Sequence, residues 1–222
     1  MYKLIRQKRK TIGIYIQNDL SVLVKAPYYM KKEAIDAFVS KNETWIAKTI
    51  SDKQALAIQK DWLTKREILY LGHTLKVEIK EMTMVKPRVE VNETTFTIIT
   101  PNKNDHFLIK KQVETYTKEQ ALQLFTQLTK EYCSLLGCKY EKITLRRQKT
   151  RWGSCSTKGA LSFNIRLMGA PIEVIRYVVL HEVVHLIHFN HSTSFWHTIE
   201  GVMPDYKVRQ NYLKEHGNIL DI

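Results

Sequence analysis

The segment Val178-Val179-Leu180-His181-Glu182-Val183-Val184-His185-Leu186-Ile187-His188-Phe189-Asn190-His191 combines an apolar helical pattern with four histidines and one glutamate. Its centre reads His-Glu-x-x-His. Histidines at positions i and i+4 of a helix lie on one face, about 6 Å apart along the axis. Their imidazoles can therefore converge on one Zn²⁺ at about 2.1 Å each. Glu182 follows the first of them, where it can act as a general base toward a water molecule.

A third ligand must come from the histidines that follow, and helix geometry separates them. His188 shares the helix face of His181 but lies about 10 Å farther along the axis. Nitrogens bound to one zinc ion are only about 3–4 Å apart, so His188 is a poor ligand on a regular helix. His191 is farther still and can bind only if the helix ends before it.

The residues around His191 supply such an end. Asn190 tolerates the left-handed conformation that a helix-ending turn needs. Residues 192–194 are Ser-Thr-Ser, which offers N-caps for a following helix. We therefore expect His191 as the third ligand, with His197 and Glu200 as the weaker alternatives.

The composition is that of a globular protein with a basic surface. The 222 residues are 44% hydrophobic and 26% charged, enough to form a core in one large or two small domains. Lys and Arg number 35 against 22 Asp and Glu, a formal charge of +13. Such a charge favours polyanions such as nucleotides or DNA, although it says little about specific recognition.

Cysteine usage and hydropathy indicate a reducing compartment. The three cysteines have no framework spacing, which argues against a disulfide scaffold. Cys155 is expected to be a small buried residue rather than a metal ligand or nucleophile. The N-terminus is basic without the apolar segment of a signal peptide, and no run of 18 apolar residues occurs. The expected location is cytoplasmic.

Residues 1–101 predict a small α+β part that is mostly antiparallel. A helical region is expected over 31–60, with a break near 40–42. Strands are expected at 11–16, 21–25, 68–71, 75–79, 88–91 and 96–100. The polar, turn-rich stretch 101–105 is the expected domain boundary, which leaves 102–222 as the catalytic domain.

For residues 102–222 the sequence predicts an α+β core. In it the helix that carries the His-Glu-x-x-His motif, called the motif helix below, packs on a small antiparallel sheet or hairpin. A long helix is expected over 114–136, ended by Gly137. Strands are expected at 142–147 and 161–167, and Pro171 should open the motif helix. Further helices are expected at about 194–200 and 206–216.

Several motifs together resemble the YgjP-like metal-dependent hydrolases, relatives of the SprT-like zinc metallopeptidases. The residues that carry the resemblance are Arg151-Trp152-Gly153-Ser154-Cys155-Ser156, Leu161-Ser162-Phe163-Asn164, Val179–Leu186, Asn190-His191-Ser192, Phe195-Trp196 and Pro204-Asp205-Tyr206. The resemblance implies a zincin-like catalytic core with His181, His185 and His191 as zinc ligands and Glu182 as general base. His188 stands where metzincins have glycine, which argues against that relative.

Peptide hydrolysis by a metal-activated water is the first expected function. Asn164, Arg166, Tyr206 and Arg151 are candidates for contacting the substrate or its oxyanion. If the 161–167 strand edges the cleft, a peptide can pair with it as an added strand.

Two other functions remain open. The first is a metal-dependent phosphoanhydride hydrolase, such as a nucleoside triphosphate pyrophosphohydrolase, in which the basic residues Arg146, Arg147, Lys149, Arg151 and Arg166 neutralise phosphates. The second is a DNA-associated SprT-like protease that uses the same basic hairpin. A noncatalytic zinc fold is the least favoured, and Mn²⁺, Co²⁺ or Ni²⁺ are alternatives to zinc because imidazole suits them all.

Overall fold

The computed structural model describes residues 2–17 and 19–220, without the side chains of residues 56–60. Contacts divide the chain into two compact units, Met1–Asp61 and Trp62–Ile222. The boundary expected at 101/102 therefore lies inside the second unit. The reason is that residues from 62 to 100 share one hydrophobic core with the C-terminal helices; in it Tyr70, Phe96 and Tyr116 pack with ring centroids 5.7–6.4 Å apart.

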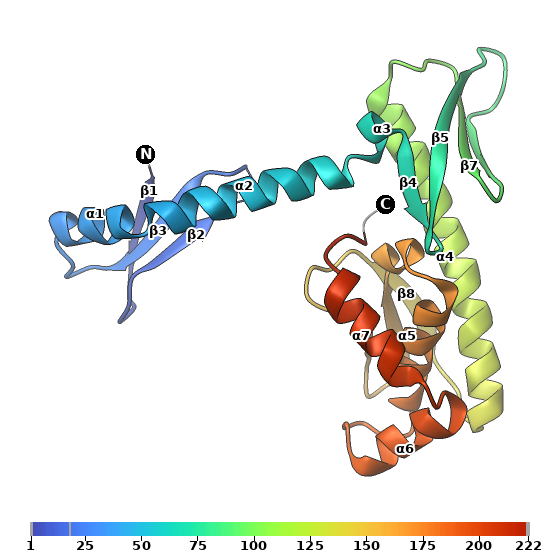
Figure 1. Ribbon diagram of the computed structural model, residues 1–222. Helices are drawn as coiled ribbons and strands as arrows, with labels where there is room; N and C mark the ends of the chain where they lie inside the picture. Colours follow the sequence, from blue (N-terminus) through green and yellow to red (C-terminus); the bar gives the residue numbers. More distant parts are fainter. Residues whose placement is uncertain (1, 18, 221–222) are drawn as a thin grey trace. The chain divides into compact units, whose positions relative to one another are not determined.

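The first unit is a three-stranded sheet with two helices on one face (Figure 1). Its elements are β1 (Lys3–Gln7), β2 (Gly13–Ile16), β3 (Val22–Pro27), α1 (Lys32–Lys41) and α2 (Glu43–Lys60). The order is β1-β3-β2, with β2 antiparallel and β1 parallel to β3. The hairpin and the break between the helices confirm the sequence predictions, whereas β1 was not predicted. Val24, Ala26 and Ile35 form the fully buried centre of the first unit.

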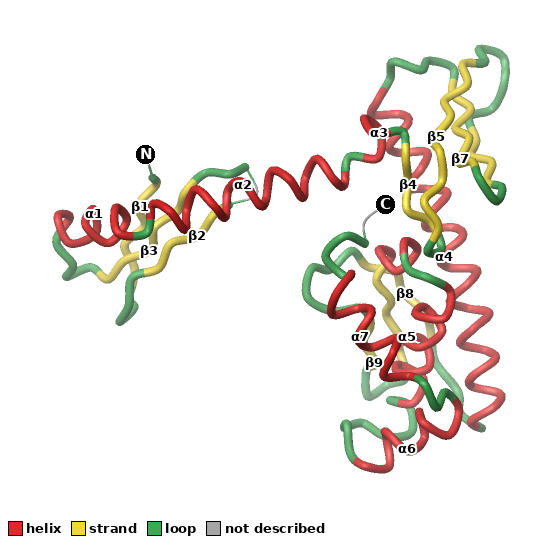
Figure 2. The backbone as a smooth tube through the Cα atoms, viewed as in Figure 1, coloured by secondary structure: helices red, strands yellow, loops and turns green. Residues whose placement is uncertain are grey.

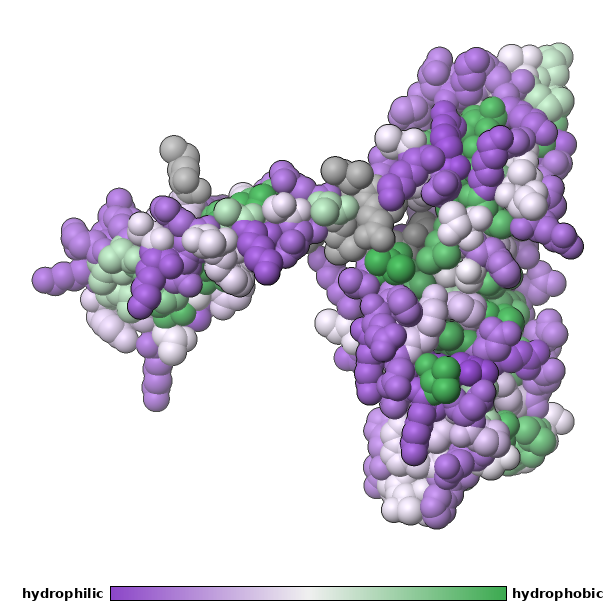
Figure 3. Space-filling model, viewed as in Figure 1, coloured by the Kyte–Doolittle hydropathy of each residue, from purple (hydrophilic) through white to green (hydrophobic). Residues whose placement is uncertain are grey.

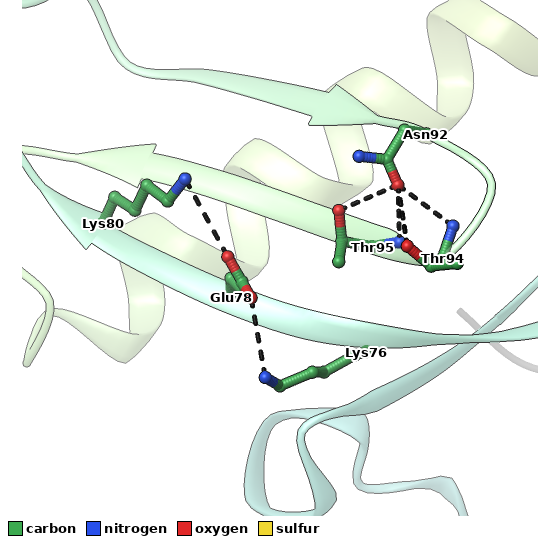
Figure 4. A network of polar contacts seen from close by, with 6 residues as sticks. All are labelled: Lys76, Glu78, Lys80, Asn92, Thr94 and Thr95. Carbon is green, nitrogen blue, oxygen red and sulfur yellow. Dashed lines mark hydrogen bonds and ion pairs between the residues drawn. The ribbon is translucent and has the colours of Figure 1, made fainter.

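The second unit begins with a four-stranded sheet. It contains α3 (Trp62–Lys65), β4 (Glu67–Tyr70), β5 (His73–Glu81), β6 (Arg88–Val91) and β7 (Thr95–Thr100), in the strand order β4-β5-β7-β6. All four strands were predicted, but β5 and β7 pair in parallel. Asn92 fixes the β6–β7 turn, because its side-chain oxygen accepts hydrogen bonds from the backbone N–H groups of Thr94 and Thr95 (Figure 4). Lys76 and Lys80 flank Glu78 on β5.

Helix α4 (His106–Leu136) is long enough to line both sheets of this unit (Figure 2). It begins at His106 rather than at Glu114, because the Asp105 side chain accepts a hydrogen bond from the Leu108 N–H and caps the helix. Gly137 ends it in the left-handed conformation, with φ of 66°, as predicted.

The second sheet of this unit is small and mixed. It contains β8 (Lys142–Arg146), β9 (Gly153–Cys155) and β10 (Ala160–Asn164) in the order β8-β10-β9. The expected antiparallel arrangement is found for β9 and β10, whereas β8 and β10 are parallel. Strand β10 is central and β9 is an edge, so the condition for adding a peptide along the 161–167 strand is not met.

The strand expected over 161–167 ends at Asn164. A 3-10 helix, η1 (Ile165–Gly169), follows, and the Asn164 side chain caps it by accepting a hydrogen bond from the Arg166 N–H. Ile165, Leu167 and Met168 are all buried, since the turn inserts this segment into the core. The apolar alternation past Asn164 thus reflects a buried turn and not a strand.

Three helices complete the second unit. Helix α5 (Ile172–Val184) follows Pro171 and is buried over most of its surface, and α6 (Thr193–Val202) and α7 (Tyr206–His216) come after it. The α+β class is confirmed, with α5 packed on β9 and β10. Within the described residues, no helix is both long and apolar enough to cross a bilayer. Hydrophilic residues dominate the visible face of each unit (Figure 3).

Candidate metal centre

Helix α5 ends before His191, as the convergence of His181, His185 and His191 on one metal ion requires. Its last residue is Val184, and His185 is the C-cap; the His188 N–H donates to the Val184 carbonyl and closes the turn. The predicted break before His191 is therefore confirmed. It occurs earlier than expected and does not use Asn190, since the non-glycine residues with positive φ in the described parts all lie in the first 71 positions.

Helix α6 begins directly after this turn and returns the chain to α5. The Ser192 side chain caps it, accepting a hydrogen bond from the Phe195 N–H at 3.4 Å, as the Ser-Thr-Ser sequence predicted. His191 then lies beside the end of α5, with its Nε2 3.1 Å from Nε2 of His181. Ring nitrogens of the three-histidine group, His181, His185 and His191, all lie within 4.8 Å of one another, close enough for one metal ion.

Neighbouring groups orient these rings. Nδ1 of His185 lies 3.0 Å from the His188 carbonyl oxygen. A carbonyl can only accept, so Nδ1 carries the proton and Nε2 keeps its lone pair for a metal. The His188 ring lies 3.2 Å from the Thr198 hydroxyl instead. The group of described residues that could hold a metal ion does not include His188 or the exposed His197 and Glu200.

Aromatic side chains support the three-histidine group. The fully buried Phe195 ring lies 4.6–4.9 Å, centroid to centroid, from each of its imidazoles. Trp196 stacks on His191 at 5.6 Å, and Tyr206 stacks on Trp196 at 5.4 Å. This wall restricts the rotation of the ligand rings and excludes water from one side of the site.

The imidazoles of His181 and His185 are held neutral. Burial lowers the pKa of His181 to about 3, assisted by repulsion from His185 and His191. Burial also lowers the pKa of His185. Neutral imidazole is the form that binds metals, so near pH 7 these nitrogens are ready to ligate without first losing a proton.

Glu182 is a buried carboxyl that faces β9. Its side chain is 6% exposed, and burial raises its pKa to about 8, although the positive charge of Arg151 opposes this shift. Gly153 on β9 makes the space: a Cβ there would lie 2.5 Å from Oε1 of Glu182. A carboxyl with a pKa near neutrality suits general acid–base chemistry, because it can both take and return a proton.

A pocket of about 320 Å³ opens beside this carboxyl. Its walls come from the motif helix, from the start of β9 and from α7. The lining residues are Trp152, Gly153, Tyr177, Val178, His181, Glu182, Gln210, Leu213 and Lys214. The sequence did not indicate the α7 residues, because only the fold brings that helix to the motif. Gly153 does carry a signal, since glycine inside a strand often marks a close approach.

The YgjP-like, metallopeptidase domain family matches residues 10–216, nearly the whole chain. The chain belongs to the YgjP-like metallopeptidase family. The crystal structure of the metallopeptidase zymogen of Pyrococcus abyssi abylysin is similar over 41% of this chain and 93% of that chain, at 23% identity and a TM-score of 0.38. No curated protein matches the sequence significantly. Family membership supports a metal-dependent peptidase, and hence a hydrolase that uses a divalent metal.

In this YgjP-like metallopeptidase both polar atoms of the Asn164 side chain form hydrogen bonds with the backbone. Its Nδ2 donates to the carbonyls of Gln148 at 2.7 Å and Arg151 at 2.9 Å, and its Oδ1 accepts from the Arg166 N–H. It therefore holds the 148–152 loop, which leads into Gly153. A contact between this amide and an oxyanion would require it to release both carbonyls.

The Arg166 guanidinium forms hydrogen bonds with the C-terminal segment. Its Nε donates to the Leu220 carbonyl and its Nη2 to the Gly217 carbonyl, both at 2.7 Å, and the guanidinium lies 5.0 Å from the Trp152 ring. It ties the C-terminal segment to the core. Of the other expected contact residues, Tyr206 is buried in the aromatic wall, and Arg151 is exposed near Glu182.

The three cysteines of this metallopeptidase are free. Cys155 lies on β9, where burial raises the pKa of its thiol to about 11, helped by the nearby charge of Glu182. A thiol held in its protonated form is a poor ligand and nucleophile. Cys155 is half-buried rather than fully buried, and its packing role stays a prediction.

Proposed function

We propose that this chain is a zinc-dependent peptidase in which the three-histidine group holds the ion and Glu182 is the general base. The observation that carries the proposal is the convergence of three imidazoles, those of His181 and His185 held neutral by burial, beside a buried carboxyl and a pocket. Three protein ligands leave one coordination position open, as catalytic zinc sites do. When bound, zinc supplies a Lewis acid that lowers the pKa of water and polarises a carbonyl.

Glu182 takes a proton from the attacking water and returns it to the leaving nitrogen. Its raised pKa, set by burial, keeps the protonated form accessible near pH 7 for the second transfer. Gly153 gives the carboxylate its place, because any side chain there would push it away. The general-base role thus depends on β9 as well as on α5.

Strand β9 offers a place for a peptide backbone. It pairs with β10 on one side and is an edge of its sheet, next to Glu182. A peptide added along β9 would have its main chain fixed by backbone hydrogen bonds. The neighbouring pocket is then available to a substrate side chain, with Leu213 and Trp152 as apolar walls and Lys214 as a cation.

Tyr206 and Arg151 remain the proposed donors to the carbonyl oxygen of the substrate. Tyr206 is stacked on Trp196, which itself stacks on the ligand His191. Arg151 lies close enough to Glu182 to lower its pKa. The three free cysteines fit a reducing compartment, which is consistent with a cytoplasmic peptidase.

The test is Glu182→Gln, with the exposed Glu173 of the same helix changed to Gln as the matched control. Wild-type, variant and control proteins are loaded with zinc and assayed on an unfolded, fluorescently labelled protein and on nucleoside triphosphates. We expect Glu182→Gln to keep fold and zinc while losing peptide hydrolysis by at least about 100-fold. Glu182-dependent hydrolysis of the nucleotides alone would replace the proposal with a phosphoanhydride hydrolase.

A further inference from the structure

One face of the sheet in the first unit is partly open to solvent. Val24 and Ala26 of β3 are fully buried on the helix side, so Leu23 and Lys25 lie on the other side. The register aligns Lys3, Leu23 and Tyr15 in one row across the three strands, and Ile5, Lys25 and Gly13 in the next. We call Lys3, Ile5, Tyr15, Leu23 and Lys25 the Tyr15 face. Its Ile5 and Tyr15 are 38% and 44% exposed, whereas Leu23 at its centre is only 7% exposed.

Aromatic rings and cations alternate around this face. The Lys25 ammonium lies 5.1 Å from the centre of the Tyr15 ring, and an Arg9 guanidinium nitrogen lies 3.5 Å from the Tyr15 hydroxyl. Tyr28 and Tyr29 follow β3 and are 69% and 76% exposed. The Tyr29 hydroxyl donates to the Lys10 carbonyl, which places this ring against the basic β1–β2 loop.

The positive charge of the first unit is concentrated here. Residues 2–30 contain six basic side chains and one acidic side chain, Asp19, whereas residues 31–61 contain six basic and five acidic side chains. Arg6 is engaged with backbone carbonyls after β3. Lys3 and Lys25 remain on the Tyr15 face and Arg9 lies against Tyr15, while Lys8 and Lys10 belong to the adjoining β1–β2 loop. The helix side of the unit is thus nearly balanced and the sheet side is basic.

The surface is also hollowed. A cavity of about 520 Å³ opens on the Tyr15 face, and its lining residues are Tyr15, Ile16, Gln17, Asp19, Leu23 and Lys25, so the carboxylate of Asp19 lies beside the Lys25 cation. An open sheet with exposed aromatic rings and flanking cations is suited to stacking unpaired bases while pairing their phosphates. A protein partner with balanced charge would not need a basic sheet side and a nearly neutral helix side.

We propose that the Tyr15 face binds single-stranded nucleic acid. The lysines and Arg9 neutralise the phosphate backbone, and Tyr15, Tyr28 and Tyr29 stack on bases that a duplex would keep buried. RNA and DNA share this chemistry. The site lies in the first unit and does not depend on the metal centre or on peptidase activity.

The test uses the full-length protein and fluorescence anisotropy with labelled 12-nucleotide single-stranded RNA, single-stranded DNA of the same sequence, and the corresponding duplex. We expect micromolar or tighter binding of a single strand and weaker binding of the duplex. Preference for RNA or for DNA identifies the natural ligand class, and both support the proposal. Affinity should fall with salt, with a log–log slope of about −2 to −3 if three or four phosphates are paired.

Two pairs of variants separate stacking from charge. Tyr15→Leu keeps an apolar side chain and should weaken single-strand binding by about tenfold or more, because stacking on one base contributes about 1–3 kcal/mol. The double variant Lys3→Glu/Lys10→Glu should weaken it further, whereas Lys41→Glu/Lys48→Glu, an equal charge change at exposed lysines of the helix side, should not. Circular dichroism verifies that each variant is folded.

Three results would overturn the proposal. The first is an absence of oligonucleotide binding by the wild-type protein at low salt. The second is equal weakening by the two double variants, which would show a response to net charge alone. The third is duplex binding as tight as single-strand binding with Tyr15→Leu unaffected, which would remove the stacking role.

Discussion

Gly153 and Glu182 are in such close contact that a Cβ on residue 153 would lie 2.5 Å from Oε1 and 2.6 Å from Cγ of the glutamate. Real Cβ atoms do not approach other atoms so closely, so either the strand or the carboxylate would have to move. The edge strand β9 and the motif helix α5 therefore fix the position of the proposed base together.

Gly153→Ala should displace Glu182 and reduce peptide hydrolysis by on the order of 100-fold, since a shift of about 1 Å in a catalytic group costs that much. Metal content should be unchanged, because the ligands lie outside this contact. Gly201→Ala is the control: Gly201 lies in α6, and an added Cβ there meets no atom within 4 Å. Steady-state kinetics and metal analysis check both, and full activity in Gly153→Ala would contradict the packing argument.

Phe195→Ala should destabilise the fold and loosen the metal site at once. The ring is fully buried against the three imidazoles, and removing a buried phenyl ring costs about 3–5 kcal/mol. Metal affinity should fall about tenfold or more as the ligand rings gain freedom. Urea unfolding and metal titration measure the two effects. Phe107→Ala, at an 80% exposed ring, should change stability by less than about 0.5 kcal/mol.

Asn164→Ala should act on stability rather than directly on chemistry. It leaves the Arg151 carbonyl without the Asn164 donor and the Gln148 carbonyl with only the 3.5 Å contact from Nη1 of Arg166, at a cost of about 1–3 kcal/mol in the free energy of unfolding. The exposed Asn211 of α7, changed to Ala, should be neutral by the same urea measurement. Peptide hydrolysis slowed by about 100-fold or more, with stability unchanged, would instead assign Asn164 to the oxyanion.

The thiol of Cys155 should be slow to react and dispensable. Burial raises its pKa to about 11, so the thiolate fraction, and with it the rate of alkylation by iodoacetamide, should keep rising about tenfold per pH unit above pH 8. Peptide mapping by mass spectrometry follows this site apart from Cys133 and Cys138. Cys155→Ala should retain zinc and hydrolysis; a rate that levels off near pH 7, or loss of activity, would make Cys155 a functional thiol.

Local sequence patterns predicted the parts of the site that lie close together in the chain. The His-Glu-x-x-His spacing, the caps at Ser192 and Gly137, and the need for a helix end before His191 all follow from rules that span a few residues. The structure agrees with each of them, except that the turn does not use Asn190 in a left-handed conformation.

Features that depend on distant parts of the chain were not predicted. Strand β1 forms because Lys3–Gln7 pairs in parallel with β3, and β10 stops at Asn164 because the next residues are needed in the core. The contact of Gly153 with Glu182, and the approach of α7 to the motif helix, are set by tertiary packing. Periodicity carries no information about such contacts.

The division of the chain was also set by tertiary packing. The turn-rich stretch at 101–105 resembles a linker, yet β7 before it and α4 after it bury apolar residues in one core. Phe96 and Ile98 on one side and Ile109 and Val113 on the other belong to that core. Composition alone marks a turn and cannot distinguish a linker from a loop within a domain.

Metal content tests the central claim, that His181, His185 and His191 hold the ion, most directly. Wild-type protein, His191→Ala and His188→Ala are each saturated with zinc, dialysed, and measured by mass spectrometry of the metal. The wild type and His188→Ala should retain about one zinc ion per chain, and His191→Ala should retain almost none. Retention of zinc by His191→Ala together with its loss from His188→Ala would contradict this ligand set.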